Sequence, residues 1–115
     1  MARGLDKHKE RLAAIAFWGK DLARRAGRKC ELCESADELR PFDLEVDAEP
    51  ALETLVLACD RCREVLGGQS PDPRTLRFLE GVVWSDLQPV AEAARRMLTG
   101  VDADWARDAL EAVGA

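Results

Sequence analysis

The sequence predicts a mostly helical α+β protein with one small β-hairpin. Two Cys-x-x-Cys units, Cys30–Cys33 and Cys59–Cys62, are separated by 25 residues. Between them hydrophobic and acidic residues alternate, which is the period of a half-buried strand. On both sides of this stretch, hydrophobic residues recur every three or four positions, which is typical of a helix that buries one face. These three observations indicate a hairpin flanked by an N-terminal helix and two to three C-terminal helices.

We expect residues 1–115 to form a single domain, because a chain of 115 residues has little material for a second one. Its expected parts are a basic N-terminal helix in residues 1–28, a cysteine-bearing hairpin and helix in residues 29–68, and a helical part in residues 69–115. Hydrophobic residues make up 47% of the chain, which excludes wholesale disorder.

Residues 5–26 are predicted to form one helix that ends at Gly27. Its hydrophobic stripe consists of Leu5, Leu12, Ile15, Ala16, Leu22, Ala23 and Ala26. We interpret this stripe as core contact and not as a face for a partner. The longest hydrophobic run, Leu12–Trp18, is too short for a signal peptide or a membrane-spanning helix. We therefore expect a cytoplasmic protein that does not bind a membrane.

The middle of the chain is predicted to form the hairpin and a short helix. The hydrophobic positions of its first strand are Phe42, Leu44 and Val46. Residues 47–50 have the composition of a turn, so residues 55–57 can pair back as the second strand. From Cys59 the chain is expected to be helical as far as Leu66, where two glycines follow.

The last part of the chain is predicted to be helical after a proline-containing link at residues 69–73. A short helix is expected to bury Leu76, Leu79, Val82 and Val83. A capping box at Ser85–Gln88 is expected to open the next helix, which ends at Gly100. The buried stripe of that helix is expected to be Leu87, Val90, Ala91, Ala94 and Leu98. Asp102 or Asp104 is expected to cap a last helix. Its inward side chains are expected to be Trp105, Ala109, Leu110 and Val113.

Charge is unevenly distributed along the chain. The 22 acidic and 17 basic residues give a formal net charge of −5, which argues against a protein that mainly coats nucleic acid or anionic membrane. Residues 1–30 carry a net charge of +6, residues 31–58 carry −8, and residues 59–115 carry −3. The first helix is therefore basic and the hairpin region acidic.

The four cysteines are predicted to bind a metal ion. A two-residue spacer allows a tight turn, or knuckle, that places two sulfurs on one metal, and two knuckles complete a tetrahedron of sulfurs. The predicted ligands are Cys30, Cys33, Cys59 and Cys62. Zinc is favoured, and an iron–sulfur cluster is the main alternative. Reduced core cysteines or two disulfides are the alternatives without a metal, and disulfides fit a cytoplasmic chain poorly.

A zinc ion held by four thiolates has no open position for an activated water, so its role would be structural. It would stabilise a hairpin that is too small to fold alone. The formal net charge would change from −5 to −7, because the thiolates add four negative charges and zinc adds two positive ones.

The order of knuckle, hairpin and helix is that of the treble-clef arrangement and resembles the outline of the HNH nucleases. Those nucleases need a hairpin histidine to activate water. This sequence has Phe42, Asp43 and Leu44 on the hairpin, and its one histidine, His8, lies in the first predicted helix among charged residues. HNH-type catalysis is therefore not expected.

Several segments around the cysteines carry a closer resemblance. They are RRAGRKCELC at residues 24–33, LRPFDL at 39–44, LACDRC at 57–62, LRFLEGVVWSDLQPV at 76–90 and RRML at 95–98. Together these segments resemble the zinc-ribbon domain of PhnA-like proteins, also called YjdM-type, over about residues 20–110. The resemblance implies a zinc-ribbon or treble-clef fold and the same four cysteine ligands.

The resemblance has departures. Glu34 stands where the family usually has a glycine after the first knuckle, and residues 77–79 lack a cysteine that is usual there. Longer members continue into an SH3-like barrel, which we expect this chain to lack. The family name implies alkylphosphonate utilisation, but no catalytic motif of a phosphonate hydrolase is present, so the resemblance extends to the fold and the ligands alone.

The expected function is that of a non-catalytic zinc-binding module whose partner is a macromolecule, a protein rather than a nucleic acid. A basic strip beside the knuckles is a candidate contact surface: Arg24, Arg25, Arg28, Lys29, Arg61 and Arg63. Solvation, or neutralisation by the acidic segment, explains this strip more simply. One alternative is a small enzyme or accessory protein of phosphonate or phosphate-ester metabolism, and another is a nucleic-acid-binding zinc module. In a further hypothesis, the first helix and the helices of residues 74–113 form a docking or dimer surface.

Overall fold

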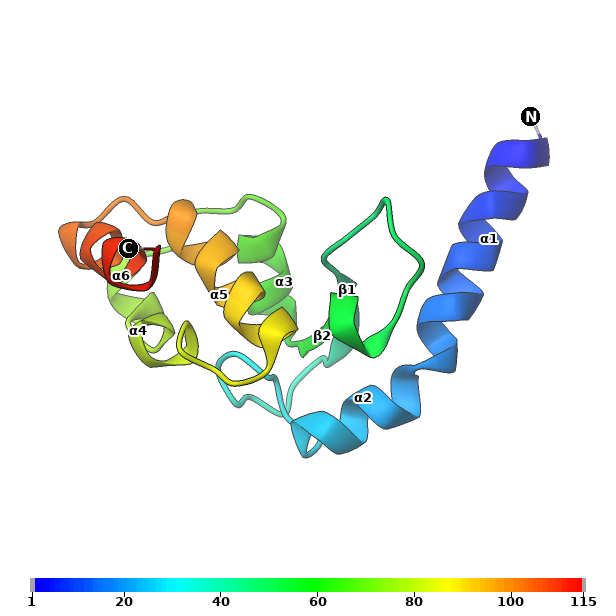
Figure 1. The fold of residues 1–115 in the computed structure, drawn as a ribbon, viewed down its shortest axis with the longest axis horizontal. Helices are drawn as coiled ribbons and strands as arrows, with labels where there is room; N and C mark the ends of the chain where they lie inside the picture. The colour runs from blue at the N-terminus through cyan, green and yellow to red at the C-terminus, as the bar shows by residue number, and fades with distance from the viewer. Residues whose placement is uncertain (1, 115) are drawn as a thin grey trace.

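The computed structural model describes residues 2–114, with the side chains of residues 7–114, as helices arranged around a two-stranded sheet (Figure 1). The elements are α1 (Ala2–Phe17), α2 (Gly19–Ala26), β1 (Arg40–Asp43), the 3₁₀ helix η1 (Leu52–Thr54), β2 (Leu55–Ala58), α3 (Asp60–Leu66), the 3₁₀ helix η2 (Pro73–Leu76), α4 (Leu79–Val82), α5 (Gln88–Thr99) and α6 (Asp104–Gly114). The molecule measures 46 × 32 × 26 Å along its principal axes. The predicted class, mostly helical with one small hairpin, is confirmed.

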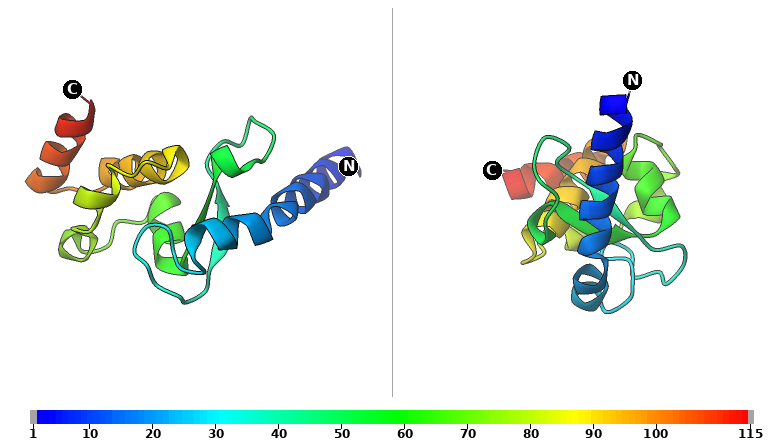
Figure 2. Two further views of the ribbon diagram at one scale, coloured as in Figure 1. Left: turned by 60° about the horizontal axis from the view of Figure 1, so that its bottom comes forward. Right: turned by 90° about the vertical axis from the view of Figure 1, so that its right-hand side faces the viewer.

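The predicted helix over residues 5–26 is in fact two helices, because the chain breaks at Trp18. The Trp18 N–H donates to the carbonyl of Ile15, three residues back, at 3.1 Å. The Trp18 indole Nε1 donates to the carbonyl of Pro50 in the hairpin connection at 2.9 Å. This side-chain contact turns α2 along the sheet while α1 extends away from the other helices, as Figure 2 shows from two further directions.

The predicted core stripe of this region holds for α2 but only in part for α1, where Ile15 is half-buried and packs against the cluster around Leu22. Leu22 in α2 is completely buried, whereas Leu12 and Phe17 in α1 are 52% and 73% exposed. The side chain of Leu5 lies outside the described residues. One hydrophobic face of α1 is therefore open to solvent, because the break at Trp18 carries α1 past the core.

The hairpin forms as predicted, but its first strand begins and ends earlier than the alternation indicated. Strands β1 and β2 are antiparallel, and Phe42 pairs with Val56. The chain bends at Leu44, whose side chain is buried in the hydrophobic core. Its N–H donates to the Thr54 carbonyl in η1 at 3.0 Å. Val46 is 68% exposed in the connection, so its placement in the strand was wrong.

A proline lies inside β1 without loss of a sheet hydrogen bond. Pro41 pairs with Leu57, whose N–H donates to the Glu31 carboxylate at 2.8 Å and whose carbonyl accepts from the Glu31 N–H at 2.8 Å. Both polar groups of Leu57 therefore point away from β1, and the pair is of the non-hydrogen-bonded kind. The missing N–H of Pro41 leaves no partner unsatisfied within the sheet.

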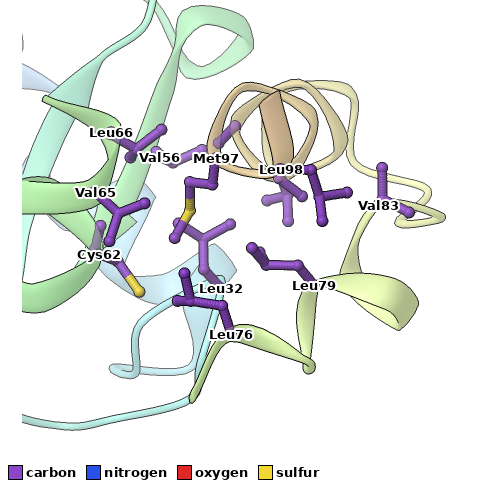
Figure 3. Close-up of a cluster of buried hydrophobic side chains, with 14 of the residues drawn as sticks. Leu32, Val56, Cys62, Val65, Leu66, Leu76, Leu79, Val83, Met97 and Leu98 are labelled. Carbon is purple, nitrogen blue, oxygen red and sulfur yellow. The ribbon is translucent and has the colours of Figure 1, made fainter. Parts of the chain in front are cut away.

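The largest hydrophobic cluster lies between the hairpin, α3 and the C-terminal helices (Figure 3). Helix α5 supplies Met97 and Leu98 to its centre, and Leu79 of α4 is completely buried against them. Cys62 and Leu32, from the two knuckles, belong to the same cluster. The cysteine region and the C-terminal helices thus share one core.

The capping box predicted at Ser85–Gln88 does not form, and α5 begins at Gln88 without a side-chain cap. The Ser85 hydroxyl instead accepts from the Leu87 N–H at 3.1 Å. Leu87 is 40% exposed, so its place in the buried stripe was wrong, and Ala91 is only half-buried. Pro89 explains the later start, since a residue without an N–H suits the first turn of a helix.

The remaining C-terminal predictions are confirmed in part. The short helix expected around residues 76–83 is two pieces, η2 and α4. Helix α6 packs its predicted inward side chains, partly buried, against the core: Trp105, Ala109, Leu110 and Val113. Ala106, which the prediction omitted, is the residue of α6 that is completely buried.

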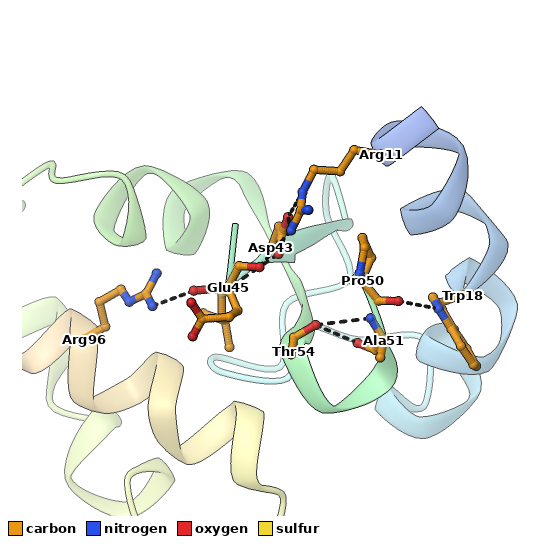
Figure 4. A network of polar contacts seen from close by, with 9 residues as sticks. Arg11, Trp18, Asp43, Glu45, Pro50, Ala51, Thr54 and Arg96 are labelled. Carbon is orange, nitrogen blue, oxygen red and sulfur yellow. Dashed lines mark hydrogen bonds and ion pairs between the residues drawn. The ribbon is translucent and has the colours of Figure 1, made fainter. Parts of the chain in front are cut away.

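Arginine side chains join the outer elements to the hairpin, and Figure 4 shows two of them. Arg11 of α1 donates from Nε to the Asp43 carboxylate and from Nη2 to the Glu45 carbonyl, both at 2.7 Å. Arg96 of α5 donates to the Leu44 carbonyl at 2.8 Å. Within the described residues, no helix has the length and hydrophobicity that crossing a membrane requires.

Candidate metal centre

The structure brings the four predicted cysteines together. Their sulfur atoms all lie within 4.8 Å of one another, and those of Cys33 and Cys59 are 3.5 Å apart. A tetrahedral ion with metal–sulfur bonds of about 2.3 Å would set the sulfurs about 3.8 Å apart. The cluster therefore has the donor set and nearly the spacing of a site for a single metal ion.

The first knuckle is a turn that directs backbone N–H groups at a sulfur. The N–H groups of Leu32 and Cys33 both point at the Cys30 sulfur, at 3.4 Å. The chain then reverses through Glu34, which has a φ of 70°. A left-handed backbone favours glycine, because a Cβ atom crowds the neighbouring carbonyl. This conformation therefore costs Glu34 about 1 kcal/mol or more.

The second knuckle is the start of a helix. Cys59 has extended backbone angles and acts as the N-cap of α3, and its sulfur accepts from the Cys62 N–H at 3.5 Å. Cys62 lies in the first turn and is completely buried. Partial positive charge at a helix N-terminus favours a thiolate there.

The sulfurs differ in how readily they lose a proton. The interaction with the Cys62 thiol, aided by backbone N–H groups, lowers the pKa of Cys30 to about 4 against the effect of burial. The same interaction with Cys30, together with burial, raises the pKa of Cys62. Burial is the main cause that raises the pKa of Cys33. Without a metal, negative charge therefore gathers on Cys30, while the thiols of Cys33 and Cys62 hold their protons.

An ion pair with little exposed surface supports the first knuckle from behind. The Glu31 carboxylate accepts from Arg25 Nε and Nη2 at 2.8 and 2.9 Å, and the two side chains are 3% and 17% exposed. Arg25 also donates to the carbonyls of Leu52 and Leu55, at 2.6 and 2.7 Å. Helix α2, the knuckle and β2 are thus fixed to one another through two side chains.

The predicted basic strip is divided by the structure. Arg25 is bound to Glu31, and Arg63 donates to the carbonyls of Glu38 and Cys59, so both act within the fold. Arg61 lies over the Phe78 ring, 5.8 Å from its centroid. The remaining members of the strip, Arg24, Arg28 and Lys29, are exposed.

Neither His8 nor the hairpin residue Asp43 belongs to the cysteine cluster. His8 is an exposed residue of α1. On the hairpin, the carboxylate of Asp43 is held by Arg11. The roles of Arg25 and Glu31 were missed by the sequence analysis. The sequence signal for this role was the position of Glu31 between two cysteines of a buried metal site, where a carboxylate needs a charged partner.

Comparison of the chain with protein families, with curated proteins and with solved structures gave no match.

Proposed function

We propose that this protein is a zinc-stabilised module of the treble-clef type, related to PhnA-like proteins, which acts by binding a macromolecule and not by catalysis. The observation that carries the proposal is the cluster of four cysteine sulfurs within 4.8 Å. Three of these cysteines belong to the main hydrophobic core, so a metal bound there would stabilise the whole fold.

Zinc is the metal that the cluster suits best. Four sulfurs this close together can bind a single ion, and a tetrahedron of four thiolates is a common structural zinc site. A dication among them would keep all four thiols deprotonated, whereas the thiols of the metal-free cluster differ in pKa. A reducing cytoplasm would keep the thiols available.

The local architecture supports the treble-clef assignment and the PhnA-like relationship. A knuckle is followed by an antiparallel hairpin, and the second pair of cysteines opens a helix. Glu34 has a φ of 70°, at the position where the PhnA-like pattern has a glycine. The glycine of that pattern would serve the same backbone conformation without strain.

A binding role follows from the chemistry of the proposed centre. Four protein ligands would complete the coordination of zinc and leave no position for a water or a substrate. The alternative role in phosphonate or phosphate-ester metabolism needs a second metal or a nucleophile with a general base.

The test is metal content and stability of the protein purified without added metal. Elemental mass spectrometry is expected to give one zinc per chain, and Cys59→Ser is expected to lose the zinc and cooperative thermal unfolding, because one missing thiolate opens the site. Ser70→Ala, in the exposed link before η2, is the control and is expected to keep both. Iron in place of zinc, a second metal, turnover of a phosphonate ester, or a cooperative transition that survives metal removal would contradict the proposal.

A further inference from the structure

The exposed face of α2 carries a groove that the metal site does not use. The groove has a volume of about 520 Å³ and is lined by Gly19, Lys20, Ala23, Arg24, Gly27 and Arg28. Residues four apart lie on the same face of a helix, so within α2 the small residues Gly19 and Ala23 form one row and the cations Lys20 and Arg24 form another. Lys20 and Arg24 are about 6 Å apart along the helix axis. Gly27 and Arg28 follow the last helical residue, Ala26, in a turn with left-handed backbone angles. No acidic residue lines the groove.

The cations of the groove are not neutralised within the molecule. Arg24 has a long ion pair with Asp21, at 3.8 Å, and its side chain is 82% exposed. Among the described residues, Lys20 and Arg28 make no ion pair. Exposed cations with weak partners are available to an anionic ligand at little desolvation cost.

The acidic character of the whole chain does not oppose such a ligand strongly. At physiological salt, charges interact over about 8 Å, whereas the molecule is 46 Å long. A ligand on α2 therefore senses the local cations far more than the overall net charge of −5.

An exposed aromatic residue precedes α2 in the sequence. Phe17 ends α1, two residues before the groove begins, and is 73% exposed. Its ring meets Trp18 edge-on, with centroids 5.1 Å apart, and the Trp18 indole is held by the Pro50 carbonyl. Proteins bind single-stranded nucleic acid by combining cations that contact its phosphate backbone with aromatic rings on which its bases stack.

We propose that the α2 groove binds the phosphodiester backbone of single-stranded nucleic acid, with Phe17 as the stacking residue for a base. The inference rests on the proposed function as a binding module and names its partner. It replaces the expected preference for a protein partner. Arg25 and Arg63 of the predicted basic strip are bound within the fold, whereas the cations of the groove are open to an anionic ligand.

The experiment measures binding of the zinc-loaded protein to a fluorescein-labelled 20-nucleotide oligothymidine by fluorescence anisotropy. Three phosphate contacts predict a slope of log K against log salt of about −2.1, which is about a 70-fold loss of affinity between 20 and 150 mM salt. The variant Lys20→Gln/Arg24→Gln/Arg28→Gln is expected to bind at least tenfold more weakly at 20 mM salt and with a slope near zero. Phe17→Ala is expected to weaken binding about tenfold, since it removes the stacking surface.

A matched control removes three exposed cations elsewhere: Arg74→Gln, Arg95→Gln and Arg107→Gln. It changes the net charge by the same amount and is expected to bind within about twofold of the wild type. Absence of binding at 20 mM salt, or an equal loss in the control, would overturn the inference. So would tighter binding of a glutamate 20-mer, or equal affinity for a duplex together with no effect of Phe17→Ala.

Metal content and thermal unfolding are measured on the same samples. A groove variant that keeps its zinc and its unfolding transition but loses the oligonucleotide separates the groove from the scaffold. If the wild type keeps zinc yet binds no oligonucleotide, the inference fails and the zinc-stabilised scaffold stands. If the wild type contains no zinc, the proposed function fails independently of the groove.

Discussion

At the scale of single residues, the side chain that organises the metal region most is Glu31, which is not a ligand. Its carboxylate accepts three hydrogen bonds, two from Arg25 and one from the Leu57 N–H, and it is almost completely buried. Burying two charges is costly, and hydrogen bonds to both partners offset that cost. Removing one partner therefore leaves the other charged and poorly solvated.

We predict that Glu31→Ala lowers the free energy of unfolding by about 3 kcal/mol, because Arg25 and the Leu57 N–H lose their partner. Urea denaturation with excess zinc measures this loss without a change in metal loading. Glu80→Ala, which removes an exposed ion pair with Arg77, is the control and should cost no more than about 0.5 kcal/mol. Equal losses in the two variants would show that the Arg25–Glu31 pair has no special structural role.

At the scale of elements, two glycines define the limits of α2 in different ways. Gly19 begins the helix and needs no special backbone angle, whereas Gly27 ends it with a φ of 65°. A Cβ atom at either position would meet nothing within 4 Å. The two sites therefore differ in backbone conformation and not in available space.

The same substitution is predicted to have opposite effects at these two sites. Gly19→Ala should stabilise the protein by roughly 0.5–1 kcal/mol, because alanine loses less conformational entropy in a helix. Gly27→Ala should destabilise it by about 1 kcal/mol, because a Cβ disfavours the left-handed backbone. Thermal unfolding monitored by circular dichroism measures both, and effects of the same sign would contradict the prediction.

The elements were predictable from sequence where a short-range pattern decides the outcome. The two-residue alternation around Phe42 located the hairpin, and the spacing of the cysteines identified all four members of the cluster. The break at Trp18 was not predictable, because its cause is a hydrogen bond to Pro50, 32 residues away in the sequence. The groove was hidden for a similar reason. Arg25 has a buried ion-pair partner, whereas Arg24 has only a long, exposed ion pair, and Lys20 and Arg28 make none among the described residues.

At the scale of the whole molecule, the proposed centre is part of the main core and α1 is not. The main hydrophobic cluster joins Cys30, Cys59 and Cys62 to residues of α5 and α6. Helix α1 is tied to the hairpin through Arg11, while its Leu12 and Phe17 face solvent. The stability of the C-terminal helices should therefore depend on the metal, and that of α1 should not.

Hydrogen exchange followed by mass spectrometry is expected to show this difference. In the zinc-loaded protein, amides of α1 should exchange fast, because a helix of 16 residues with few tertiary contacts is marginally stable. Amides of β2, α3 and α5 should exchange slowly and lose their protection together when a chelator removes the metal. Lasting protection of α5 after chelation would show that the C-terminal helices fold independently of the centre.

Pro41 has a consequence for how these molecules meet one another. A two-stranded sheet has two free edges, and each could recruit a strand from another chain. The outer edge of β2 is occupied by Glu31 and Arg25, which bind the polar groups of Leu57 and Leu55. On the outer edge of β1, Pro41 has no N–H to offer to an incoming strand. Both edges of the sheet are thereby protected against intermolecular β-aggregation, even though the hairpin contains the hydrophobic run Leu55–Ala58.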